Sequence, residues 1–95
     1  MVSSGKIEIK KFNGQSFELW KLKMEDLLVD KDQLIVVYSG TKPTGVSDEE
    51  WKKLDQKAKS TIQLCVSDSV LLNVSGEATV KALWDKLGTL YVSGE

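Results

Sequence analysis

The chain has 95 residues, of which 41% are hydrophobic, and its 13 basic side chains nearly balance 14 acidic ones. This length predicts one small domain, residues 1–95. Because every cation is lysine and histidine is absent, the composition argues against a dedicated nucleic-acid binder and against most catalysis at neutral pH. One cysteine excludes an internal disulfide, and the N-terminus has no apolar run typical of a signal peptide or membrane span. We therefore expect a cytoplasmic protein that contacts no membrane.

The N-terminal quarter predicts an arm followed by a helix. Residues 1–11 alternate lysine with apolar residues and are expected to be flexible or extended. The helix is predicted from Ser16 to Asp30, because Ser16 can cap it and Glu18 lies in its positive first turn. Charged side chains mostly occupy its outer surface. The residues expected on its buried face are Phe17, Trp20, Met24, Leu27 and Leu28.

The apolar run from Leu34 to Tyr38 is too short for periodicity to separate a strand from a helix. Its β-branched side chains favour a strand, yet the sequence offers no second strand of similar quality to pair with it. We therefore predict a short helix that begins at Asp32. Residues 40–45, which contain proline and two glycines, predict a loop.

The motif Ser47-Asp48-Glu49-Glu50 predicts a capping box, in which Ser47 accepts the Glu50 amide and Glu50 reaches back to the Ser47 amide. A long helix should begin here, with favourable acid–lysine surface pairs such as Asp55–Lys59. Ser67 is expected to end this helix and to cap another short one. The residues predicted on the apolar side of the long helix are Trp51, Leu54, Ala58, Ile62, Cys65 and Val66.

A break at Ser75-Gly76 separates these elements from a final amphipathic stretch, residues 77–92. Gly88 lies inside this last helix and lowers its stability unless close packing requires the missing side chain. Together the elements predict an all-α bundle of four or five helices with short connections. Its core is expected to contain Phe17, Trp20, Met24, Leu27, Leu54, Ala58, Ile62, Cys65, Leu83 and Trp84.

The sequence contains no pattern that predicts a catalytic residue, a cofactor or a metal site. Its neighbouring carboxylates fall on predicted exposed faces, where solvated surface and helix capping explain them better than acid–base chemistry. No phosphate-binding glycine motif occurs, and Cys65 has no histidine to activate it, so an inert core thiol is favoured. Trp20, Trp51 and Trp84 fit a shared core, with the alternative that Trp51 faces a partner.

Three segments occur in a recognisable order: KFNG with SFELWKLKMEDLL, then GVSDEEWKKLDQKAKSTIQLCVSDSV, then ALWDKLGTLY. Their order and spacing resemble the start of Gag polyproteins from plant copia-type LTR retrotransposons, over a span from about Ile7 to Tyr91. The resemblance implies a non-enzymatic capsid-like protein with a helical N-terminal capsid domain, which assembles into a shell around the RNA of the element. Such polyproteins usually continue into further capsid helices and an RNA-binding zinc knuckle, so we expect this chain to be truncated before them.

Truncation would leave uncovered apolar surface, which predicts self-association into a dimer or a larger assembly with itself or another Gag-like chain. The alternative is a small Gag-derived adaptor or regulator that binds another protein, either a host protein or Gag itself as a dominant-negative subunit. Direct binding of nucleic acid ranks third and is not expected, and an enzyme ranks last. The residues assigned to the self-association or partner surface are Trp51, Leu87, Leu90, Tyr91 and Val92.

Overall fold

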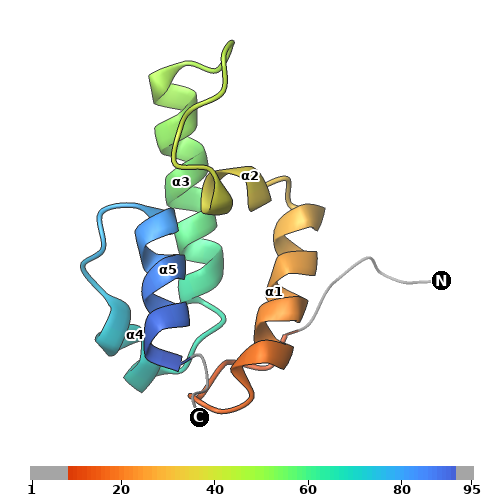
Figure 1. The fold of residues 1–95 in the computed structure, drawn as a ribbon, viewed down its shortest axis with the longest axis vertical. Coiled ribbons are helices and arrows are strands. Elements are labelled where there is room, and N and C mark those ends of the chain that lie inside the picture. The colour runs from red at the N-terminus through yellow and green to blue at the C-terminus, as the bar shows by residue number, and fades with distance from the viewer. Residues whose placement is uncertain (1–8, 92–95) are drawn as a thin grey trace, which may run out of the picture.

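The computed structural model describes residues 9–91, which form five helices and an isolated β-bridge but no strand (Figure 1). This arrangement confirms the all-α bundle predicted from the sequence. Residues 1–8 of the predicted N-terminal arm lie outside the described part of the chain. The helices in chain order are α1 (Phe17–Asp30), α2 (Leu34–Tyr38), α3 (Asp48–Gln63), α4 (Asp68–Val74) and α5 (Val80–Tyr91).

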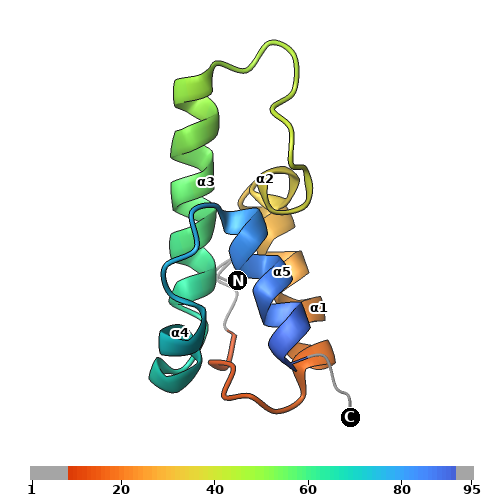
Figure 2. The ribbon, with the colours of Figure 1, turned by 60° about the vertical axis from the view of Figure 1, so that its left-hand side comes forward.

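Helices α1, α3 and α5 surround a common core, with α2 across one end of the bundle and α4 beside the C-terminal half of α5 (Figures 1 and 2). α1 and α5 run in opposite directions, and the N-terminal half of α3 projects beyond the other helices together with the loop before it (Figure 2). The buried apolar residues form one cluster: Phe12, Phe17, Trp20, Met24, Leu27, Leu28, Val36, Val37, Ala58, Ile62, Val66, Val70, Val74, Val80, Leu83, Trp84 and Leu87.

All predicted core residues lie in this cluster except Leu54 and Cys65, which are partly buried and pack against it. Two of the three tryptophans meet inside it, since the rings of Trp20 and Trp84 are 6.0 Å apart between centroids. Trp51 is partly buried and packs on the edge of the same cluster. The large aromatic side chains therefore serve mainly to hold the helices together.

Two helix starts follow the capping chemistry predicted from the sequence. Ser47 Oγ accepts a hydrogen bond from the Glu50 amide at 3.1 Å, and Glu50 Oε1 accepts one from the Ser47 amide at 3.2 Å. This confirms the capping box at the start of α3. At the start of α4, Ser67 Oγ accepts from the Val70 amide at 3.4 Å. Each serine has an extended backbone, as an N-cap requires.

The caps predicted for the starts of α1 and α2 are wrong in detail. Ser16 occupies the N-cap position of α1, but its backbone is left-handed, with φ of 58°, and its side chain makes no capping hydrogen bond. Asp32 has the same kind of backbone, with φ of 57°, and Gln33 takes the N-cap position of α2 instead. An N-cap side chain reaches the helix amides from an extended backbone, so neither residue is placed to cap.

The predicted Asp55–Lys59 surface pair does not form, because both side chains bind the segment that leads into α5. The Asp55 carboxylate accepts from the Val80 amide. Lys59 Nζ donates to the carbonyl oxygens of Glu77 and Ala78, at 3.0 and 3.2 Å. Two polar side chains in the middle of α3 thus anchor the start of α5.

The segment before α1 is tied to the connection between α3 and α4. The Phe12 amide donates to the Cys65 carbonyl at 2.9 Å, and the Ser67 amide donates to the Phe12 carbonyl at 2.8 Å. The two segments meet there in an isolated parallel bridge between Phe12 and Val66. Since α3 ends at Gln63, the predicted helical positions of Cys65 and Val66 are wrong, and both residues belong to this connection.

Candidate interaction surface

The residues predicted for self-association occupy different environments. Leu87 is fully buried on the inner side of α5, so its assignment to a partner surface is wrong. The Tyr91 ring lies edge-on to Phe12 with centroids 5.0 Å apart, and its hydroxyl oxygen accepts from Asn73 Nδ2 at 3.0 Å. Tyr91 therefore makes contacts within its own chain.

Of the other three residues of the predicted surface, Trp51 and Leu90 also differ from one another in how exposed they are. Trp51 is partly buried against the core, and Val92 lies outside the described residues. Leu90 is 49% exposed near the end of α5. Among the described members of the predicted set, Leu90 is the one most open to a partner.

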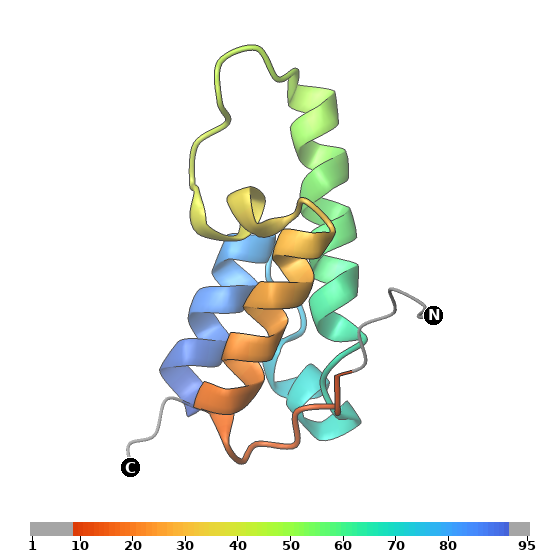
Figure 3. The ribbon, with the colours of Figure 1, turned by 90° about the vertical axis from the view of Figure 1, so that its right-hand side faces the viewer.

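A row of exposed apolar side chains instead runs along the outer side of α1. Leu19, Leu22 and Val29 are 56%, 60% and 57% exposed, and their spacing of three and seven residues places them on one side of the helix. Ile35 of α2, which is 50% exposed, extends the row and shares a shallow hollow with Val29. We call these four residues the α1 face. Figure 3 views the molecule with α1 in front.

The charged residues of α1 do not reveal the α1 face. Lys21, Lys23, Glu25 and Asp26 suggested an ordinary solvated surface, yet apolar residues lie among them. α1 is thus apolar on two opposite sides, one of which is core. A helix that is apolar well beyond its buried side is the sequence signal that predicts a second packing partner.

Charges border the α1 face unevenly. Glu18, Lys21 and Lys23 lie in the N-terminal half of the helix, whereas Glu25, Asp26 and Asp30 lie in the C-terminal half. Lys23 and Asp26 are both exposed, at positions next to the apolar row. The N-terminal half of α1 therefore carries charges of both signs, with two lysines, whereas the C-terminal half is acidic.

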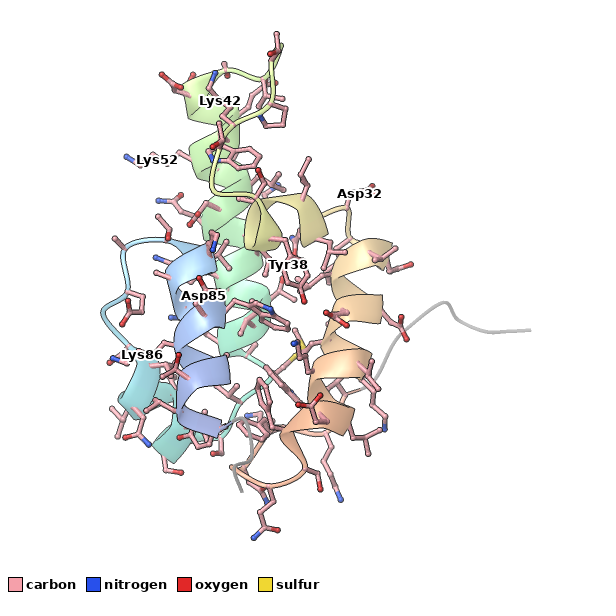
Figure 4. The ribbon with its side chains drawn as sticks, in the orientation of Figure 1. Asp32, Tyr38, Lys42, Lys52, Asp85 and Lys86 are labelled. Atoms are coloured by element: carbon pink, nitrogen blue, oxygen red, sulfur yellow. The ribbon has the colours of Figure 1, made fainter. Side chains whose placement is uncertain are left out.

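Tyr38 fixes α2 against α1 and α5 (Figure 4). Its hydroxyl donates to the Glu25 carboxylate, and its ring lies edge-on to Trp84 with centroids 6.0 Å apart. Partial burial, together with this hydrogen bond, raises the pKa of Tyr38 to about 12. The phenol therefore remains protonated at neutral pH and keeps its hydrogen bond to Glu25.

Two further open hollows border α1. One, of about 300 Å³, has Phe12, Leu19 and Trp20 in its walls together with three lysines. The other, of about 490 Å³, lies between α1 and α5 and includes Trp84 and Asp85 (Figure 4). The Asp85 carboxylate accepts from Lys81 Nζ at 2.8 Å on the same helix, an exposed ion pair of small energetic value.

The remaining chemistry of residues 9–91 is sparse. Burial raises the pKa of the half-buried Cys65 thiol, which opposes formation of the reactive thiolate. No group of three or more cysteine or carboxylate side chains in the described residues could hold a metal ion. Every helix in this part of the chain is too short or too polar to cross a bilayer.

Comparison with known proteins relates the chain to a family, whose model matches from the second half of α1 onward. Residues 24–95 match the family described as the gag-polypeptide of LTR copia-type. The chain belongs to this family. The resemblance to plant copia-type Gag inferred from the sequence motifs is thus confirmed for this Gag domain.

A curated relative supports the same membership. The Gag domain is 36% identical over 94 residues to the retrovirus-related Pol polyprotein from transposon TNT 1-94 of Nicotiana tabacum. The alignment covers 97% of this chain and 7% of that polyprotein, so the chain spans a small part of the length of its relative. No solved structure matches the chain.

Proposed function

We propose that this Gag domain is a non-enzymatic, capsid-like structural module that associates with further copies of itself. The α1 face is the observation that carries the proposal. It places Leu19, Leu22 and Val29, each more than half exposed, on the side of α1 opposite the core. Burial of these exposed apolar side chains favours association, since each Å² removed from water contributes about 25 cal/mol. Membership in a Gag family supports a structural role.

The proposal keeps the self-association expected from the sequence but moves its centre from α5 to α1. Leu87 is buried and Tyr91 is engaged with Phe12 and Asn73 within the chain, so α5 offers mainly Leu90 to a partner. The lone cysteine fits a reducing compartment, and we place the assembly in the cytoplasm on that ground.

Absolute mass measured by light scattering across a concentration series tests the proposal. The wild-type chain should form a dimer or a larger species as its concentration rises. The double variant Leu22→Ser, Val29→Ser should remain monomeric in the same range. In a symmetric contact each substitution acts twice, so we expect the free energy of association to become less favourable by about 4 kcal/mol. This corresponds to a dissociation constant roughly a thousandfold higher.

Leu72→Ser is the matched control, because Leu72 is 76% exposed on α4, away from α1 (Figure 1). This control should associate like the wild type, and circular dichroism should show unchanged helix content in every variant. A wild-type chain that is monomeric at all concentrations, or a double variant that associates normally, would overturn the proposal. The adaptor role expected as the alternative would then explain the α1 face better.

A further inference from the structure

We infer that two copies of this chain pair through α1 in an antiparallel, two-fold symmetric arrangement. The inference rests on the proposed function and adds the geometry of the contact. It is carried by the order of charges beside the α1 face, which distinguishes a second copy of this helix from other apolar partners. The partner that we propose for the α1 face is therefore α1 of an identical chain.

The charges that matter are Lys23 and Asp26. Lys23 follows Leu19 by four residues, and Asp26 lies between Leu22 and Val29 on the same side of the helix. Within residues 9–91 neither side chain forms an ion pair, and both are exposed. Each is thus available to a charge supplied from outside the chain.

An antiparallel neighbour supplies those charges. Leu19 and Val29 are equally far from Met24, near the middle of α1, so a two-fold axis there sets Leu19 of one copy opposite Val29 of the other. The same register sets Lys23 opposite Glu25 of the second copy and one residue away from its Asp26, so Lys23 lies beside both carboxylates, and symmetry repeats the contacts. Favourable charge pairs of this kind fix the register of an apolar contact.

A parallel arrangement in the same register would have the opposite effect. Lys23 would face Lys23 of the second copy, and Asp26 would face Asp26, so both contacts would be repulsive. The dipoles of the two helices would also be aligned side by side, whereas antiparallel packing opposes them. α1 lies at an edge of the bundle, where another helix can approach its outer side (Figures 1 and 3).

Charge reversal separates these possibilities. In the antiparallel pair, Lys23→Glu alone and Asp26→Lys alone should each weaken self-association about tenfold, because each change makes both symmetric contacts repulsive. An equimolar mixture of the two variants should associate as tightly as the wild type, since every contact between them again joins opposite charges. Light scattering and native mass spectrometry of the mixture measure both effects.

Lys53→Glu on α3 and Asp68→Lys on α4 are the matched controls, because both residues are exposed on other helices. They should associate like the wild type, alone and mixed. If the wild type self-associates but the two α1 variants behave like these controls, the antiparallel arrangement is wrong while the proposed function stands. Preferential pairing of Lys23→Glu with wild type would indicate the parallel arrangement and overturn the inference. A monomeric wild type would instead overturn the proposed function, and the inference with it.

Discussion

The Asp55 carboxylate of α3 caps the start of α5, since each of its two oxygens lies 3.1 Å from the backbone nitrogen of Val80. That amide is one of the donors that a helix start leaves without a partner, and Val80 itself is fully buried. Thr79 satisfies a further amide, because its hydroxyl accepts from Ala82 at 3.1 Å. A side chain in the middle of one helix thus determines where another begins.

Asp55→Ala should lower the free energy of unfolding by about 1–3 kcal/mol, because it leaves the buried Val80 amide without an acceptor. Asp55→Asn retains one oxygen and should lose less. Asp48→Ala is the control, since its side chain is 98% exposed and its ion pair with Lys42 spans 3.5 Å; we expect a change within about 0.5 kcal/mol. Urea denaturation measures all three. Equal stability of Asp55→Ala and the wild type would show that the cap contributes nothing.

Gly88→Ala should stabilise the chain by up to about 1 kcal/mol. A Cβ atom at Gly88 would have no neighbour within 4 Å, so close packing does not require glycine at this position of α5. Gly76→Ala should have the opposite effect, because Gly76 has φ of 92°, a conformation that alanine rarely adopts. The midpoint of thermal unfolding distinguishes the two variants. A destabilised Gly88→Ala would indicate that α5 needs its glycine for another reason.

The sequence predicted elements best where a signal is local. The capping box of Ser47 and Glu50 needs only four consecutive residues, and it marked the start of α3 correctly. Ser16 and Asp32 have equally suitable side chains, but their backbones are left-handed. For Asp32 the reason is the end of α1, because the Asp32 and Gln33 amides donate to the Val29 and Leu28 carbonyls of its last turn. Residue type alone does not encode this backbone geometry, so caps were predicted at residues that do not cap.

Contacts between distant segments were harder to predict from one sequence. Asp55 and Lys59 are spaced for a surface ion pair. In the fold, both side chains instead form hydrogen bonds with the backbone at the start of α5, and the sequence alone does not place that segment beside them. Leu87 could not be separated from Leu90 as a surface residue without knowing which side of α5 meets the core. The α1 face was readable in principle, because α1 has more apolar residues than one buried side requires.

Tyr38 should make stability depend on pH in the alkaline range. Its pKa is raised from the ordinary value of 10.0 to about 12, first by burial and then by the hydrogen bond to Glu25. Between pH 10 and pH 12 Tyr38 is mainly protonated in the folded chain and mainly deprotonated in the unfolded chain, so unfolding releases a proton. The stability that Tyr38 contributes is therefore fully present below pH 10 and is lost as pH rises through 12. Tyr38→Phe should show a shallower fall in stability over that range, measured by urea denaturation at several pH values. An identical fall in both chains would exclude Tyr38 as its source.

Phe12→Ala should be among the most destabilising single changes, at about 3–5 kcal/mol. The ring is 2% exposed, and its centroid lies 5.1 Å from that of Trp20 and 5.0 Å from that of Tyr91, so it joins the segment before α1 to two helices. Because domains of this size are stable by only about 5–15 kcal/mol, the loss is a large fraction of the total.

A comparison of Phe12→Leu with Phe12→Ala separates the contribution of the ring from that of the backbone bridge. Both variants keep the Phe12 backbone amide and carbonyl, which form hydrogen bonds with Cys65 and Ser67. Leucine fills much of the space and should lose about 1.5 kcal/mol. Urea denaturation followed by tryptophan fluorescence measures both, since Trp20 stacks on the ring that is removed. If Phe12→Ala and Phe12→Leu lose the same small amount, the backbone bridge rather than the aromatic cluster holds this segment in place.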